Sequence, residues 1–226
     1  MRILFLGDLV GKPGYSGVLK HADSLRQELR LDALVVNAEN ASDGSGLMPN
    51  QYKKLIQSGV DAMTLGDHIY RCKDLIPTLE SSDRIVKPAN YPPEAPGRTW
   101  TIVETPAGPL GIISVMGRVF MRPVDCPFLA LDRALDEIGD SATHILVDVH
   151  AEATSDKQVL ARYLDGRVSA VLGTHTHVPT ADATVLPGGT AFQCDVGMCG
   201  PYESIIGRDI DRVMKTTRTF EPIHFY

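Results

Sequence analysis

The chain has 226 residues, of which 43% are hydrophobic and 22% are charged. This ordinary globular composition excludes wholesale disorder, a collagen-like chain and a coiled coil, and the length suits one domain over residues 1–226 with a full core. Asp and Glu number 28 against 22 Lys and Arg, which gives a formal net charge of −6. That charge argues against a general role in nucleic-acid binding, because the phosphate backbone attracts basic proteins.

The cysteines and the apolar runs bear on the compartment of the protein. The four cysteines form no C-x-x-C pair and match neither a zinc ribbon nor a dense disulfide framework, so reduced thiols are expected. The apolar run that opens the chain is interrupted at Asp8, too early for a signal peptide. No stretch approaches the roughly 18 apolar residues of a spanning helix. We therefore expect a cytoplasmic protein without a membrane partner.

Strands and helices alternate through the first third of the chain. Continuous apolar runs predict the strands, and apolar residues at helical spacing predict the helices between them. The expected elements are strands over Arg2–Gly7, Ala33–Ala38, Asp61–Leu65 and Arg84–Lys87, separated by helices over Gly17–Arg30, Asn50–Ser58 and Arg71–Glu80. This alternation is typical of a parallel sheet covered by helices on both faces.

The pattern changes after Lys87, where eight of the 15 prolines fall within residues 88–127. Turn sequences rich in Pro and Gly separate two pairs of apolar runs and predict two hairpins. The expected elements are a hairpin over Thr99–Glu104 and Leu110–Val115, a helix over Leu129–Ile138, a strand over His144–Val149, a helix over Lys157–Leu164, a strand over Ser169–Leu172 and a hairpin over Asp182–Leu186 and Thr190–Cys194. The later part of the sheet is therefore predicted to be mixed.

Polar residues of the kinds that bind metals follow five of the predicted strands. They are Asp8, Glu39 with Asn40, Asp67 with His68, His150, and His175 with His177. The carboxyl ends of strands in open α/β sheets line the ligand crevice, so these side chains are expected at one edge. In extended backbone residues i and i+2 point to the same side, so His175 and His177 can face one ion.

The chemistry of this set favours catalytic rather than structural metal. Its ligand atoms are oxygens and nitrogens without a thiolate, which suits Mn²⁺, Fe or Zn²⁺. Up to seven of these eight residues are potential ligands, which exceeds the needs of one ion and implies two, with a carboxylate between them, an arrangement used for displacement at phosphorus. Taken singly, each residue has a structural alternative: Asp8 could cap a turn, and His150 could be a hydrogen-bonded core histidine.

The ordered motifs resemble one family. They are Gly7-Asp8-Leu9-Val10-Gly11, Asn37-Ala38-Glu39-Asn40, Gly66-Asp67-His68, His150-Ala151-Glu152-Ala153-Thr154, Gly173-Thr174-His175-Thr176-His177-Val178 and Asp195-Val196-Gly197-Met198. This set resembles the YmdB-type metallophosphoesterases of the calcineurin-like superfamily. The resemblance implies a four-layer α/β/β/α sandwich of mixed sheets with a dinuclear metal site. It also implies a phosphodiesterase that acts on small phosphodiesters such as 2′,3′-cyclic or 3′,5′-cyclic nucleotides, by attack of a hydroxide that bridges the metals.

The resemblance also implies roles for individual residues. Asp8, Asn40 and His177 would bind the first metal, Glu39 would bridge, and Asp67, His150 and His175 would bind the second. His68 would stabilise the phosphate and donate a proton. The metals would be Fe or Mn, with Zn as an alternative, and the assembly a homo-oligomer.

One position departs from the family pattern, which has Gly-Asn-His where this chain has Gly66-Asp67-His68. Aspartate adds a negative charge that asparagine lacks. This charge could favour a trivalent ion such as Fe³⁺, weaken the Lewis acidity of the site, or favour a less charged substrate.

Further residues and functions stay open at this point. Arg118 or Arg122 could bind phosphate, or could be ordinary surface arginines. Glu152 could orient His150, and Asp195 could orient a ligand histidine, although each could equally occupy a simple loop or turn. The alternative functions are a phosphomonoesterase or nucleotidase, and a metal-bound regulatory scaffold with little turnover.

Overall fold

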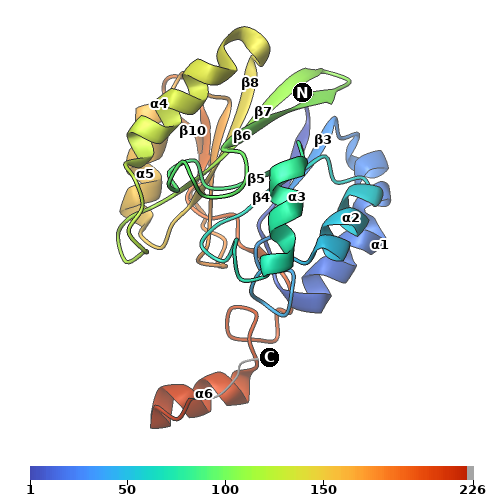
Figure 1. Cartoon of the computed structure of the whole chain (residues 1–226), viewed down its shortest axis with the longest axis vertical. Helices are drawn as coiled ribbons and strands as arrows, with labels where there is room; N and C mark the ends of the chain where they lie inside the picture. The colour runs from blue at the N-terminus through green and yellow to red at the C-terminus, as the bar shows by residue number, and fades with distance from the viewer. Residues whose placement is uncertain (223–226) are drawn as a thin grey trace.

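The computed structural model describes residues 1–222 and places two sheets face to face (Figure 1). The first sheet is parallel throughout, as predicted from the alternation of strands and helices. Its strands, in spatial order, are β1 (Ile3–Leu6), β3 (Ala33–Asn37), β4 (Ala62–Thr64) and β5 (Ile85–Val86).

The second sheet is mixed. Its strands, in spatial order, are β10 (Thr184–Val185), β11 (Ala191–Gln193), β9 (Ala170–Thr174), β8 (His144–His150), β7 (Gly108–Met116) and β6 (Trp100–Thr105). The four central strands, β11, β9, β8 and β7, run parallel. The two expected hairpins supply the antiparallel pairs at the edges of the sheet. This arrangement confirms the predicted change of pattern in the later part of the chain.

Helices cover the outer face of each sheet and complete four layers. The first sheet carries α1 (Gly11–Leu29), α2 (Pro49–Gln57) and α3 (Ile76–Ser81), and the second carries α4 (Pro127–Ile138) and α5 (Thr154–Leu164). Alternate residues of one strand serve the two faces: Leu34 and Val36 pack with the helices, whereas Val35 packs with Ile112 of the opposite sheet. The expected α/β/β/α sandwich is confirmed.

Several boundaries differ from those predicted. The helix expected from Gly17 begins at Gly11, because Pro13 is tolerated in a first helical turn. The helix expected over Arg71–Glu80 starts as a 3₁₀ turn, η1 (Lys73–Leu75), and a second 3₁₀ turn, η2 (Gly139–Ser141), follows α4. The strands of the last hairpin are shorter than expected.

Three further elements were not predicted. The short strands β2 (Asp8–Leu9) and β12 (Met198–Cys199) pair in parallel and join the two ends of the chain. Helix α6 (Ile210–Thr219) buries none of its residues and lies apart from the body in Figure 1. Among the described helices, none combines the length and apolarity needed to cross a bilayer.

Candidate metal centre

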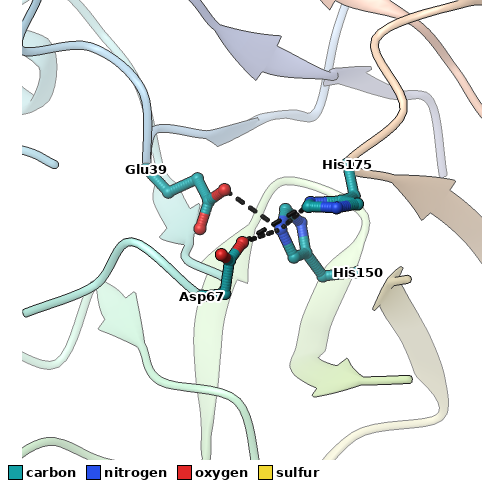
Figure 2. A group of neighbouring side chains, drawn as sticks. All are labelled: Glu39, Asp67, His150 and His175. Atoms are coloured by element: carbon teal, nitrogen blue, oxygen red, sulfur yellow. Dashed lines mark hydrogen bonds and ion pairs between the residues drawn. The ribbon is translucent and has the colours of Figure 1, made fainter. Parts of the chain in front are cut away.

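Four of the predicted ligands converge where strands of both sheets end. Glu39 follows β3 and Asp67 follows β4, while His150 ends β8 and His175 follows β9. One ligand atom from each lies within 4.8 Å of the others (Figure 2). The His150 Nε2 atom is 3.0 Å from Glu39 Oε1 and 3.1 Å from Asp67 Oδ1. Two carboxylates and two imidazoles at this spacing can hold a metal ion.

Hydrogen bonds behind His150 fix which ring nitrogen faces this cluster. The Thr174 hydroxyl donates to Asp148 Oδ1 over 2.6 Å and therefore accepts from His150 Nδ1, 2.9 Å away. Nδ1 therefore carries a proton, and Nε2 is the ring nitrogen that faces Glu39 and Asp67. Burial opposes a charge on His150, but the two carboxylates raise its pKa well above the ordinary value, so Nε2 is protonated until an ion replaces that proton. This orientation is the one required of a metal ligand.

Asp148 anchors that arrangement from the core. Its other oxygen accepts from Thr64 Oγ1 at 2.5 Å and from Asn37 Nδ2 at 3.0 Å. Burial raises the pKa of the Asp148 carboxyl to about 6, although the charge of His150 and these hydrogen bonds oppose the rise. Asp148 thus connects both sheets directly beneath the cluster.

A second group of predicted ligands lies on the other side of Glu39. The Asn40 Nδ2 atom is 3.4 Å from Asp8 Oδ1, 3.4 Å from Glu39 Oε1 and 3.3 Å from His177 Nε2. His177 Nδ1 donates to the carbonyl of Ile206 over 2.8 Å, so Nε2 is the ring nitrogen that faces this group. Two carboxylates and an imidazole therefore surround one amide nitrogen.

This second group suits a cation because its acceptors outnumber its donors. A half turn of the Asn40 amide exchanges its nitrogen for the oxygen that metals bind. The residues would then offer two carboxylates, an amide oxygen and an imidazole, with Glu39 common to both groups. Oxygen and nitrogen ligands of this kind fit a divalent transition metal.

The turn that carries His175 and His177 is held in an unusual conformation. Both histidines have positive φ angles, 93° and 64°, a region that costs a non-glycine residue about 1–3 kcal/mol. Asp195 holds the turn through Thr176, whose N–H and hydroxyl both donate to Asp195 Oδ2. Asp8 accepts from the His175 N–H at 3.0 Å. Asp195 thus contacts the backbone between the histidines and not an imidazole ring.

Lys157 is a supporting residue that the sequence reasoning missed. Its Nζ atom donates to Asp195 Oδ2 over 2.7 Å, and both side chains are 1% exposed. Lys157 lies at helical spacing with the buried residues Leu160 and Leu164 of α5. A lysine in that apolar series was the available signal for a buried ion pair.

His68 lies at the border of both groups. Its backbone N–H donates to Glu39 Oε2 at 3.1 Å, and its ring atom Nδ1 is 2.7 Å from Asn40 Oδ1. Its Nε2 is 3.7 Å from Asp67 Oδ2, and the side chain is 20% exposed. His68 can therefore reach both the ligand cluster and solvent.

The remaining candidate residues, Glu152, Arg122 and Arg118, have different surroundings. Glu152 Oε2 is 3.2 Å from Nε2 of His175, so Glu152 supports this histidine rather than His150. Arg122 lies beside the Tyr91 hydroxyl. Burial raises the pKa of this hydroxyl, Arg122 lowers it, and the charges of Asp67 and Glu39 raise it further. For Arg118, the structure describes only backbone hydrogen bonding to Asp156.

Asp8 and Asp67 stay ionised at neutral pH. Burial alone would raise the pKa of Asp8, but the hydrogen bond from His177 and nearby imidazoles lower it to about 2. Burial likewise opposes ionisation of Asp67, and hydrogen bonds from His150 and His175 hold its pKa well below the usual range. Anionic ligands are thus ready for cations at neutral pH.

The model of one protein family, described as "YmdB-like protein", matches residues 4–226, which is nearly the whole chain. The chain belongs to this family. The predicted family resemblance is thereby confirmed.

Relatives with known names and structures agree. The chain is 44% identical to 2′,3′-cyclic-nucleotide 2′-phosphodiesterase of Bacillus subtilis (strain 168), over 100% of this chain and 85% of that protein. The structure matches the crystal structure of a hypothetical protein from Thermus thermophilus, with a TM-score of 0.94, 48% identity and coverage of 100% and 87%. It also matches a novel phosphatase from Mycoplasma pneumoniae, with a TM-score of 0.91, 31% identity and coverage of 99% and 81%. The expectation of an enzyme that hydrolyses phosphoesters is confirmed.

Proposed function

We propose that this YmdB-like protein is a dinuclear metal-dependent phosphodiesterase that hydrolyses 2′,3′-cyclic nucleotides. The observation that carries the dinuclear assignment is the position of Glu39. Its Oε1 atom lies 3.0 Å from His150 Nε2 in one ligand group and 3.4 Å from Asn40 Nδ2 in the other. One carboxylate between two sets of ligands is the arrangement expected when two ions share a bridging group.

The two groups divide the predicted ligands without conflict. Asp8, Asn40 and His177 would hold the first ion, Asp67, His150 and His175 the second, and Glu39 both. When bound, the ions would supply Lewis-acid activation of the phosphate and of a water molecule. The donor set contains only oxygen and nitrogen, and Asp67 adds an anionic oxygen, so we assign Fe or Mn ahead of Zn.

His68 is assigned the proton-transfer role. Asn40 lies against His68 Nδ1, and with its amide turned toward the ion, Asn40 Nδ2 would donate to Nδ1, which leaves the His68 proton on Nε2 toward the partly exposed side of the cluster. In hydrolysis of a 2′,3′-cyclic phosphate, the bond between phosphorus and the 2′ oxygen breaks while one to the water oxygen forms. The departing 2′ oxygen needs a proton, and the Nε2–H group of His68 would provide it.

The substrate assignment rests on the Bacillus subtilis relative, which is named for 2′,3′-cyclic nucleotides. We also assign Arg122 to the phosphate, because a guanidinium matches phosphate oxygens in geometry. We rank 3′,5′-cyclic nucleotides second. A phosphomonoesterase is the alternative activity, and it is favoured by the Mycoplasma pneumoniae structure described as a phosphatase.

Hydrolysis assays with a defined metal content test this assignment. We expect about two transition ions per chain by elemental analysis, and faster hydrolysis of 2′,3′-cyclic AMP than of 3′,5′-cyclic AMP. Bis-p-nitrophenyl phosphate should react faster than the monoester. His68→Ala should lower turnover about 10²–10⁴-fold with metal content unchanged, because it removes a general acid and no ligand.

Asp8→Ala is the matched comparison, since it should lose metal together with activity. Loss of both metals in His68→Ala would contradict the role given to His68. Faster hydrolysis of the monoester would favour the phosphomonoesterase. Stoichiometric metal without turnover of any of these compounds would indicate a regulatory scaffold.

A further inference from the structure

A separate cavity of about 440 Å³ lies between α4 and the segment over residues 87–100. None of the proposed metal ligands lines it among the described residues. Its walls include the cations Lys87, Arg98 and Arg133 and the aromatic ring of Trp100. The volume falls in the range of about 300–1,000 Å³ that is typical of small-molecule sites.

Trp100 gives this cavity a fixed aromatic surface. The indole Nε1–H donates to Glu137 Oε2 over 2.7 Å, which joins the first residue of β6 to helix α4. The ring is also partly buried against the core beneath α4. A held ring offers a stacking surface at little cost in side-chain entropy. A planar group is therefore the apolar part of a ligand that fits here.

The charges of the cavity favour an anion. Its single lining carboxylate, Glu137, is engaged by Trp100, whereas the described structure shows no carboxylate paired with the guanidinium of Arg98 or Arg133. The Lys87 side chain is buried, and its Nζ donates only to the carbonyls of Pro92 and Ala95. Lys87, Arg98 and Arg133 thus line one cavity of a protein whose net charge is −6. Guanidinium groups match phosphate oxygens in geometry.

We propose that this cavity binds a nucleoside monophosphate, with its base against Trp100 and its phosphate paired with Arg98 and Arg133. The choice of a nucleotide over another aromatic anion rests on the proposed function, whose product would be such a monophosphate.

Trp100 is the sole tryptophan of the chain and reports on this cavity alone. We would titrate chelator-treated protein with adenosine 3′-monophosphate, adenosine, inorganic phosphate and benzoate, exciting tryptophan selectively and measuring heats in parallel. Saturable one-to-one binding of the monophosphate, at least about tenfold tighter than each of the others, is expected because it alone uses both the ring and the cations.

Substitutions distinguish this cavity from the metal centre. Arg98→Gln and Arg133→Gln should each weaken binding about tenfold or more, since each removes a charge-assisted hydrogen bond. Arg162→Gln, an exposed arginine of α5, and His68→Ala should leave binding unchanged.

Three outcomes would overturn the proposal: no saturable signal in either measurement, unchanged binding in both arginine variants, or loss of binding in His68→Ala. Benzoate that binds as tightly as the monophosphate would overturn the nucleotide assignment. Because neither metal nor turnover enters these measurements, failure of the phosphodiesterase assignment would leave their result standing.

Discussion

Gly66 lies where two of the proposed ligands meet. A Cβ atom at this position would overlap with the His150 ring and the Glu39 carboxylate. The close approach of these groups therefore depends on a residue without a side chain. Gly66 precedes Asp67, so the same turn also sets the direction of a third ligand.

Gly66→Ala should accordingly disrupt metal binding. The added methyl group would push His150 and Glu39 apart, and we expect retained metal to fall to well below one ion per chain. Elemental analysis after gel filtration measures this. Gly17→Ala is the matched control, because a Cβ there meets nothing within 4 Å. Full metal content in Gly66→Ala would contradict the proposed ligand geometry.

Asp67 supplies a charge that affects metal affinity directly. Asp67→Asn keeps the shape of the side chain and removes one negative charge, so the affinity for the ions should fall about tenfold or more. An ion pair at 4 Å is worth about 4 kcal/mol even at an effective dielectric constant of 20. Competition with a chelator, followed by elemental analysis, measures the change without reference to activity.

Asp136→Asn, at an exposed position of α4, controls for the loss of charge as such. Unchanged metal affinity and metal identity in Asp67→Asn would show that the Asp67 carboxylate does not act as a charged ligand.

At the scale of elements, the sequence was sufficient wherever local patterns decide structure. The apolar runs of β3 and β8 were recognisable because both faces of a covered parallel strand are buried. The pairing of β2 with β12 was not predictable, since it joins two-residue strands from opposite ends of the chain. Two-residue strands carry too little periodicity to be read from sequence.

The candidate site likewise contains residues that the sequence predicts and residues that it does not. Residues such as Glu39 and His150 were predictable because the carboxyl ends of parallel strands meet at one edge. The groups that support them were not, since the bonds between Asp148 and Thr64, or between Lys157 and Asp195, depend on how the elements pack.

The buried pair of Lys157 and Asp195 should matter for stability. Lys157→Met leaves the Asp195 carboxylate buried without its partner, and we expect the free energy of unfolding to fall by about 3–5 kcal/mol. Urea denaturation of the metal-free protein measures this loss. Lys215→Met breaks the exposed pair with Glu221 and should cost less than about 1 kcal/mol. Equal losses in both variants would contradict the structural role given to Lys157.

At the scale of the whole molecule, α6 is set apart from the four layers. It contributes no buried residue, and its exposed side chains include Ile210 and Met214. The loop before it nevertheless supports the site, because the carbonyl of Ile206 holds His177. The expectations of one domain and of a homo-oligomer stay predictions.

Removal of α6 should therefore change stability little. A chain that ends at Asp209 keeps Ile206, and its free energy of unfolding per chain should stay within about 0.5 kcal/mol of the full chain. Leu55→Ala, at a fully buried position of α2, should cost about 2–5 kcal/mol for comparison. A loss of that size on truncation would mean that α6 is covered in solution.

The ligand groups come from both halves of the sandwich, with Glu39 and Asp67 on one sheet and His150 and His175 on the other. Ions bound by these residues would link the two sheets to each other. Because a ligand that binds only the folded state stabilises it by an amount that grows with the logarithm of the free ligand concentration above Kd, metal supply would govern resistance to proteolysis as well as turnover. Starvation for metal would then shorten the lifetime of the enzyme itself.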